Sequence, residues 1–251
     1  MSLYRKSNPS PYRDSLVVEA KGLELIRQTL AAADIGELRV PRVESVSGRQ
    51  LVLEQIAPGA PTPELMARLG LGLARLHGLK QARYGLEYNN CIGLSRQPNR
   101  MTEAWGRFFV EDRLGYQVAL VEDARLKGQF EALLTRKRDR LVAFLDRHCE
   151  HPSLVHGDLW GGNVLYGNDQ VWLIDPAVYY GDREVDLAMT ELFGGFSEAF
   201  YQSYDGQLPR SRAYPVKKSI YNLYHVLNHY NLFGASYLPA CRRHFKVLER
   251  L

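Results

Sequence analysis

The stretch that decides the fold covers residues 156–176 and reads HGDLWGGNVLYGNDQVWLIDP. Its two short apolar runs, VLY and VWLI, are separated by Gly, Asn and Asp, which tight turns favour. This pattern predicts a β-hairpin between two polar loops, HGDLWGGN before it and IDP after it. Because a hairpin returns the chain to its starting point, we expect Asp175 to lie beside Asn163.

Three side chains of this stretch suit phosphoryl transfer. Transfer of the γ-phosphoryl group of ATP needs a carboxylate that accepts the proton of the attacking hydroxyl, and oxygen ligands for the Mg²⁺ that bridges the phosphates. Asp158 supplies the first group, and Asn163 and Asp175 supply the second. Each motif alone is more typical of an Asx turn at a loop end. Together they predict a catalytic base at Asp158 and a site for Mg²⁺ and ATP at Asn163 and Asp175.

The rest of the chain has the composition of an ordinary globular protein. Its 251 residues, 45% hydrophobic and 24% charged, suffice for one large domain or two unequal lobes. It has no apolar run of about 18 residues and no signal-peptide core, so membrane association is not expected and the cytoplasm is the expected location. The three cysteines form no CxxC pair, which predicts free thiols.

The charge of the chain is mildly basic, with a formal net charge of +4 and a pI of 8.9. Its arginines are scattered and do not form a tract with interleaved aromatic residues, so nucleic acid is not expected as a partner. The excess positive charge fits an anionic ligand such as a nucleotide. It fits a solvated surface with a few surplus arginines equally well.

Upstream of the hairpin, the sequence pattern changes once, from a region with one helix and two strands to a region dominated by helices. Apolar residues at helical spacing predict a helix over residues 16–33, and two apolar-rich runs within residues 38–56 predict a pair of strands. The segment APGAPTP then marks a link, and helical patterns dominate from residue 62 onward, at 64–77, 108–122, 130–148 and 219–233. We therefore predict an α+β protein with a small β-rich lobe, residues 1–57, and a large, mostly helical lobe, residues 58–251.

HGDxxxxN is also the catalytic-loop pattern of aminoglycoside phosphotransferases and other small-molecule kinases related to protein kinases. Four further strings extend the likeness: IDPAVYYGDREVDLAM, NNCIGLSRQPN, FFVEDRLGYQ and NLYHVLNHYNLFG. With them, the chain resembles the fructosamine kinase (ketosamine kinase) family over nearly its whole length. The resemblance implies a bilobal protein-kinase-like fold with ATP in the cleft. It also implies phosphorylation of a sugar hydroxyl on a ketoamine, the glycation adduct of an amine.

By motif position, the resemblance gives Asp158 the role of general base and makes Asn163 and Asp175 the magnesium ligands. It adds Asp186 as a buried carboxylate that holds the backbone of the catalytic loop. His156, the first residue of the HGD motif, is likewise expected to be structural.

In the small lobe, the resemblance implies that Lys6 is the strand lysine that grips the phosphates and that Glu19 is its partner on the following helix. Backbone groups at Glu54 and Ile56 are expected to bond the adenine. Related kinases place two strands and a Gly-rich loop ahead of this lysine, and five residues precede Lys6 here. We therefore expect an N-terminally truncated small lobe with weakened ATP binding and turnover.

Several aromatic and imidazole side chains are secondary candidates. Trp160 with Tyr179 or Tyr180 could form an apolar wall for a sugar, and core packing is a comparable possibility for each. His225 and His229 stand at i and i+4 and could chelate a metal from one helix face. A metal site there is disfavoured because no third ligand accompanies them.

Three functions remain open from the sequence. The first is an active kinase whose acceptor is a small-molecule ketoamine or a glycated protein. The second is a catalytically weak or inactive nucleotide-binding or ligand-binding homologue, and the third is a kinase of another small amino alcohol or an aminoglycoside. The acceptor sugar and the oligomeric state are not determined at this level.

Overall fold

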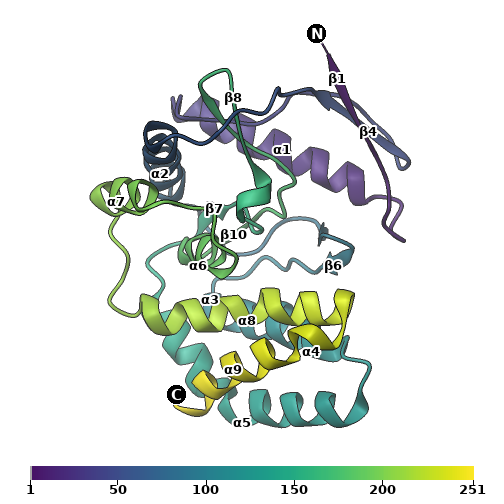
Figure 1. Cartoon of the computed structure of the whole chain (residues 1–251). Helices are drawn as coiled ribbons and strands as arrows, with labels where there is room; N and C mark the ends of the chain where they lie inside the picture. The colour runs from purple at the N-terminus through teal and green to yellow at the C-terminus, as the bar shows by residue number, and fades with distance from the viewer. Residues whose placement is uncertain (1) are drawn as a thin grey trace.

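The computed structural model describes residues 2–251 and has the α+β, two-lobe architecture expected from the sequence (Figure 1). The elements of the small lobe are β1 (Leu3–Ser7), α1 (Ser15–Ala32), β2 (Leu38–Arg39), β3 (Val43–Val46) and β4 (Gln50–Glu54). Strands β1, β4 and β3 form an antiparallel sheet in that order, with Lys6 opposite Leu51 in the register. Lys6 therefore lies on a strand, as predicted.

The large lobe is mostly helical. Its helices are α2 (Pro63–His77), α3 (Trp105–Phe108), the π-helix η1 (Phe109–Gly115), α4 (Tyr116–Ala119), α5 (Ala124–His148), the 3-10 turn η2 (Gly161–Asn163), α6 (Glu184–Leu192), α7 (Glu198–Gln207), α8 (Tyr214–Phe233), the 3-10 turn η3 (Ala235–Tyr237) and α9 (Leu238–Glu249). Its strands are β5 (Asn90–Ile92), β6 (Ser95–Gln97), β7 (Ser153–Val155), β8 (Val164–Gly167), β9 (Gln170–Leu173) and β10 (Tyr179–Gly181). Within residues 2–251, no helix has both the length and the apolar character needed to cross a bilayer.

The predicted hairpin is present as β8 and β9. Its two turn residues, Asn168 and Asp169, have φ values of 53° and 55°, the left-handed region that tight hairpin turns require. Strand β9 also pairs in parallel with β2, so that Leu38 lies opposite Val171. This pairing joins the small lobe to the β8–β9 hairpin. The lobe boundary at residue 57 stays a prediction, and β2 and β9 form a contact across it.

The predicted helix over residues 16–33 is α1, and its regularly spaced apolar residues are buried as expected. Leu16, Leu23, Ile26 and Leu30 are buried on one face. The predicted helix over residues 108–122 is interrupted, because its middle is the wider π-helix η1. Below the hairpin, Trp105 is the centre of a cluster of aromatic rings on α3, η1, β10 and α8: Phe108, Phe109, Tyr179 and Tyr221.

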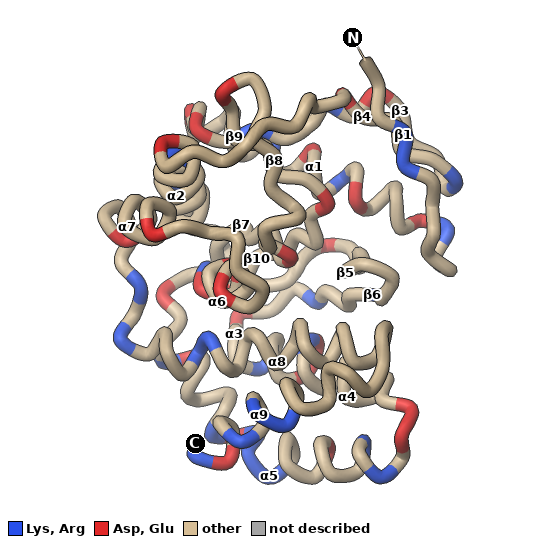
Figure 2. The backbone as a smooth tube through the Cα atoms, in the orientation of Figure 1, with Lys and Arg blue, Asp and Glu red and all other residues tan. Residues whose placement is uncertain are grey.

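Charged side chains are distributed over the whole molecule. Figure 2 shows Lys and Arg residues on β1 at one end and on α9 at the other, with Asp and Glu residues on the elements between them. The cysteines Cys91, Cys149 and Cys241 are unpaired within the described residues. Lys and Arg residues therefore occur at both ends of the molecule, in line with the scattered arginines of the sequence.

Candidate active site

The HGD loop places Asp158 through a sharp backbone turn. Gly157 has φ +81°, and a Cβ there would lie 2.2 Å from the carbonyl oxygen of Ala177, so only glycine fits. Asn163, in the η2 turn, donates from Nδ2 to the backbone oxygen of Asp158 at 2.8 Å and to its Oδ2 at 3.3 Å. Asp158 and Asn163, two of the predicted site residues, are thus in contact, and the Oδ1 of Asn163 keeps its capacity to accept or to bind a cation.

Asp186 anchors the backbone of this loop. Its carboxylate accepts the backbone N–H of His156 at 2.7 Å and that of Gly157 at 2.9 Å, and His77 Nε2 lies 3.2 Å away. Burial opposes ionisation of Asp186, but His77, His156 and the backbone donor outweigh it and hold its pKa below the usual value. This geometry supports the structural part that the sequence suggested for Asp186.

His156 connects the HGD loop to the loop after β9. Its Nδ1 accepts the backbone N–H of Asp158 at 3.3 Å, and its Nε2 lies 2.9 Å from the carbonyl oxygen of Ile174. Since a carbonyl only accepts, the ring proton is assigned to Nε2. Burial lowers the pKa of His156, so the ring is neutral and acts as a fixed spacer between Asp158 and Asp175.

The small lobe contributes a lysine held by two carboxylates. Lys6 Nζ lies 2.9 Å from both carboxylate oxygens of Glu19 and 3.0 Å from Asp175 Oδ1. Burial alone would lower the pKa of Lys6, but Glu19 and Asp175 raise it, so the amine stays charged. Asp175 has φ +52°, a conformation that Asp tolerates better than most residues. Three predicted residues from separate elements therefore meet at one point.

A cavity of about 280 Å³ opens beside this cluster, and we call it the lysine cavity. Among the residues that line it are Lys6, Glu19, Asp158, Asn163 and Asp175. The predicted hinge residues Glu54 and Ile56 are not among its lining residues. Glu54 instead exchanges backbone and side-chain hydrogen bonds with Arg42. Adenine binding at this hinge therefore stays a prediction.

A second cavity, of about 400 Å³, lies on the other side of Asp158, and we call it the aromatic cavity. Asp158 and Trp160 line both cavities. The Trp160 ring lies directly on Gly162, where a Cβ would be 2.2 Å from the ring. The other lining residues are mostly apolar: Ile92, Gly93, Phe193, Asn228, His229, Leu232, Phe233 and Tyr237.

Tyr179 and Tyr180 do not line either cavity. The Tyr179 ring is 1% exposed and stacks on Trp105, and the Arg113 guanidinium lies 4.1 Å from its centre. Tyr180 pairs through its backbone with Gly85. Of the three aromatic residues expected to form a sugar wall, only Trp160 lines a cavity together with Asp158, and Tyr179 belongs to the core.

Asp158 is a carboxyl group with an environment suited to a base. Its side chain is 19% exposed. Burial raises its pKa to about 7; Asn163 opposes the shift, and the negative charges of Asp175 and Asp186 add to it. A carboxylate with a raised pKa holds an abstracted proton better than an ordinary aspartate does at neutral pH.

Of the two α8 histidines considered from the sequence, His229 lines the aromatic cavity and His225 does not. His229 Nδ1 lies 2.8 Å from the backbone oxygen of His225, so Nδ1 carries a proton. In the tautomer that donates from Nδ1, Nε2 is the acceptor nitrogen. No group of three or more His, Cys, Asp or Glu side chains that could hold a metal occurs within residues 2–251. Sequence reasoning missed Asn228, His229 and Leu232 as cavity residues, although their i, i+1 and i+4 spacing places Asn228 and Leu232 on one helix face.

The oxygen donors near Lys6 fit the way in which proteins bind Mg²⁺ together with the phosphates of a nucleotide. Mg²⁺ is usually held by one or two protein oxygens together with substrate phosphates and water, and not by a full protein cage. Asn163 offers an amide oxygen, and Asp175 offers a carboxylate that is 43% exposed. Two oxygen donors beside an open cavity satisfy that requirement without a third protein ligand.

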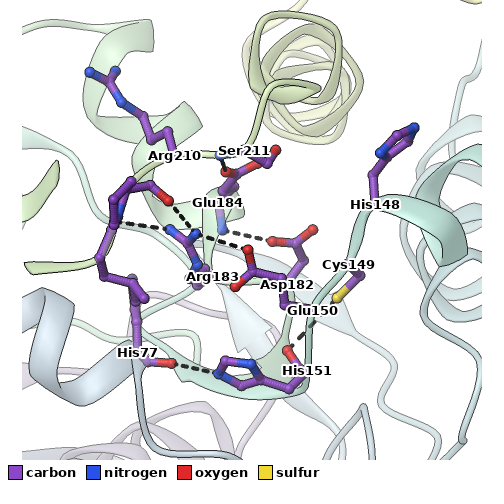
Figure 3. A network of polar contacts seen from close by, with 12 residues as sticks. His77, His148, Cys149, Glu150, His151, Asp182, Arg183, Glu184, Arg210 and Ser211 are labelled. Carbon is purple, nitrogen blue, oxygen red and sulfur yellow. Dashed lines mark hydrogen bonds and ion pairs between the residues drawn. The ribbon is translucent and has the colours of Figure 1, made fainter.

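Behind the HGD loop, a buried polar network fixes the start of α6. Figure 3 shows the Glu184 carboxylate beside Ser211, which donates to it, and the backbone N–H of Glu184 donating to Asp182. Lys217 Nζ on α8 lies 2.5 Å from Asp182 and 2.7 Å from Glu184. Burial would lower the pKa of Lys217, but the two carboxylates raise it. Because Asp186 lies on the same first turn of α6, this network indirectly holds the HGD loop.

Comparison with known proteins gives consistent matches. A family model described as "Fructosamine kinase" matches residues 2–250. A probable ketoamine kinase of Synechocystis is 42% identical over 255 residues, which cover 98% of this chain and 82% of that protein. A crystal structure of a "putative fructosamine-3-kinase" from Haemophilus somnus has a TM-score of 0.84 at 29% identity, covering 98% of this chain and 83% of that one.

A more distant match concerns the fold alone. An aminoglycoside phosphotransferase with bound ADP has a TM-score of 0.60 at 15% identity, covering 98% of this chain and 93% of that chain. Together with the nearer matches, this likeness confirms the predicted α+β, protein-kinase-like fold class.

Proposed function

The chain belongs to the fructosamine kinase family, and from this premise we propose that it transfers the γ-phosphoryl group of ATP to a sugar hydroxyl of a ketosamine. The observation that carries the proposal is the position of Asp158, which lines both the lysine cavity and the aromatic cavity. A phosphotransferase needs its base at the boundary between donor and acceptor. The lysine cavity has charged groups that suit the phosphates of ATP, and the aromatic cavity has ring faces that suit a sugar acceptor.

The lysine cavity is the proposed nucleotide side. Lys6 supplies a charged amine for the phosphates, and Glu19 holds that amine in place. Asn163 and Asp175 would hold Mg²⁺, which neutralises phosphate charge when it is bound. Lys6 and Asp175 are 3.0 Å apart, so these groups converge on one small volume where phosphate oxygens can be bound.

The aromatic cavity is the proposed acceptor side. A ketosamine combines the apolar C–H faces of a sugar with hydroxyl groups and a protonated amine. Trp160, Phe193 and Phe233 offer ring faces that suit both the C–H surface and the cation. His229 Nε2 offers an acceptor for a hydroxyl or an ammonium N–H. The few polar groups among aromatic ones are typical of an oriented small-molecule site.

The proposed chemical step uses Asp158 as general base. The acceptor hydroxyl donates its proton to the Asp158 carboxylate while its oxygen forms a bond to the γ-phosphorus and the bond from that phosphorus to the β,γ-bridging oxygen breaks. ADP leaves with the electrons of that bond. Asn163 keeps the carboxylate oriented through its Nδ2. Asp186 keeps the loop backbone in place during this step.

The direct test is ATP consumption with a defined acceptor. We expect ADP to form when a ribulosamine or fructosamine is supplied, free or on a glycated protein, and not with the unglycated amine. An aminoglycoside and choline complete the acceptor panel. Turnover of one of these two with no turnover of any ketosamine would contradict the proposed acceptor class. Nucleotide binding without turnover of any acceptor would instead favour a binding protein.

Lys6→Met is expected to lower kcat/KM for ATP by about 100-fold, because the phosphates lose their charged partner in the lysine cavity. The acceptor KM should change much less. Steady-state kinetics at saturating acceptor measure the effect. Lys21→Met is the matched control, since Lys21 is an exposed lysine of the same helix as Glu19 and lines neither cavity. Equal losses in the two variants would contradict the role of Lys6.

Phe233→Ala is expected to raise the acceptor KM about tenfold, because one aromatic face of the acceptor cavity is lost. The ATP KM should stay within about twofold, since Phe233 does not line the lysine cavity. Phe233 is 61% exposed, so the fold should tolerate the change. Leu120→Ala is the matched control. It removes another exposed apolar side chain, directly after α4, and should alter neither KM.

A further inference from the structure

His225 is a buried imidazole with an unpaired nitrogen beside the catalytic carboxylate. It lies on α8 and is 3% exposed. Its Nδ1 is 4.0 Å from Asp158 Oδ1 and has no hydrogen-bond partner within the described residues, 2–251. Buried polar nitrogens are nearly always hydrogen-bonded, so an unpaired one aimed at a functional carboxylate needs an explanation.

The surroundings of His225 make it a neutral donor. Burial lowers its pKa to about 3; His229 and Arg113 contribute to the shift, and the charge of Asp186 opposes it. The Tyr224 ring lies edge-on at 5.2 Å and restricts the imidazole. Because the polar group facing Nδ1 is a carboxylate, which only accepts, the proton is assigned to Nδ1. A neutral donor can orient a base without the strong loss of basicity that a cation would cause.

Among the described residues, a side-chain hydrogen-bond donor contacts one oxygen of the Asp158 carboxylate and not the other. Asn163 donates to Oδ2 at 3.3 Å, whereas Oδ1 faces His225 across a gap of 4.0 Å. A normal hydrogen bond would need that gap to shorten by about 1 Å, which is within the reach of a small side-chain rotation. Catalytic hydrogen bonds are often long in the free enzyme and shorten in the reacting complex.

We propose that His225 is a positioning residue for Asp158, whose Nδ1–H donates to Asp158 Oδ1 in the reacting complex. With Asn163 on the other oxygen, the plane of the carboxylate is then fixed, and its remaining lone pairs face the acceptor hydroxyl. The inference rests on the proposed function, because it takes Asp158 as the base. It adds to that function a residue for which the sequence had offered only a disfavoured metal site.

Helix α8 gives this contact a connection to the acceptor. His225 is followed on the same helix by Asn228, His229 and Leu232, which line the aromatic cavity. Gln117 holds this part of α8 through a hydrogen bond of 3.2 Å to Asn228. An acceptor that contacts these residues therefore binds the same rigid element that carries His225, so substrate binding and the orientation of the base are mechanically linked.

The test compares His225→Leu with His225→Asn. Leu removes the donor and fills similar space, whereas the Asn side-chain nitrogen occupies nearly the place of Nδ1. We expect kcat of His225→Leu to fall about tenfold, as for other partners that orient a functional side chain, with both KM values within about twofold. His225→Asn should recover most of the lost turnover. Wild-type kcat in His225→Leu, or equal losses in both variants, would overturn the proposal.

Two further measurements separate positioning from a structural role and from failure of the proposed function. In an Asp158→Asn background, His225→Leu should leave the residual rate unchanged, because the group to be oriented is gone. In ¹⁵N spectra of the imidazole rings, His225 should be protonated on Nδ1, and that signal should shift in Asp158→Asn. The inference is overturned if His225 is protonated on Nε2 and its ¹⁵N signal is the same in the wild type and in Asp158→Asn. This outcome holds whether or not the wild type turns over ketosamines. Absence of turnover in the wild type counts against the proposed function alone.

Discussion

Asp158→Asn is expected to reduce ketosamine-dependent ATP consumption about 1,000-fold, the largest effect on activity of any single substitution considered. The amide keeps the shape of the side chain and the contact with Asn163, but it cannot accept the proton of the acceptor hydroxyl. Because the loss lies in the chemical step, kcat should fall while both KM values change little. Initial-rate measurements at saturating ATP and acceptor give kcat directly.

The fold of Asp158→Asn should be intact. Burial already raises the pKa of Asp158 to about 7, so replacing the carboxylate by a neutral amide removes a charge that the site disfavours. We expect a Tm equal to or above that of the wild type. Asp169→Asn is the matched control, since it makes the same change at an exposed turn residue 11 positions away in the same stretch. Equal ATP consumption by the wild type and Asp158→Asn would refute the assignment of the base.

Lys217→Met is expected to have the largest effect on stability, a loss of about 3–5 kcal/mol in the free energy of unfolding. The variant leaves Asp182 and Glu184 buried next to each other without their shared cation. Both carboxylates keep other donors, since Tyr221 donates to Asp182 at 2.7 Å and Ser211 donates to Glu184. These bonds satisfy lone pairs but do not neutralise two negative charges in the core.

Urea unfolding monitored by far-UV circular dichroism measures this loss, which should also lower Tm by roughly 10 °C. Lys218→Met is the matched control. The neighbouring lysine is 37% exposed and pairs with Glu191, and such exposed pairs contribute about 1 kcal/mol or less. A second substitution, Asp182→Asn, should restore part of the stability of Lys217→Met. Equal losses in the two lysine variants would show that the buried cluster is not special.

The two predictions address different parts of one structure. Lys217 lies on α8 eight residues before His225, and its partners Asp182 and Glu184 precede Asp186 by four and two residues. The ion pairs of Lys217 with Asp182 and Glu184 therefore connect α8 to the start of α6, where Asp186 holds the loop that carries Asp158. Loss of Lys217 should weaken turnover only to the extent that it loosens this connection, whereas loss of Asp158 removes the chemistry and leaves the structure in place.

The sequence predicted correctly those features that depend on residues close together in the chain. Turn residues such as Asn168 and Asp169 specify a hairpin through their own backbone preferences, and the apolar spacing of residues 16–33 specifies the buried face of α1. The meeting of Asn163 with Asp158 also follows from short-range geometry within one loop. The identities of these residues and their spacing therefore sufficed for the fold class and for the centre of the candidate site.

The sequence did not predict the burial of side chains that pack against residues distant in the chain. Tyr179 is in the same stretch as the catalytic residues, yet its ring is in the core because Trp105 and Arg113, more than 60 residues away, pack against it. Lys217 gave no signal in the sequence, since an ordinary lysine in an amphipathic helix is expected to be solvated. In the structure Lys217 is buried against two carboxylates distant in sequence, Asp182 just before α6 and Glu184 at its start.

The HGD loop, the hairpin and the IDP loop were thus determined by the sequence alone, because turn preference and strand alternation act over a few residues. The sequence also sufficed for the family, through strings spread along the chain. Only the tertiary structure decided that Asp158 separates two cavities of different chemistry, and that His225 faces it from α8. Those relations join residues about 70 positions apart, and their distances are set by how the helices pack, which no local pattern encodes.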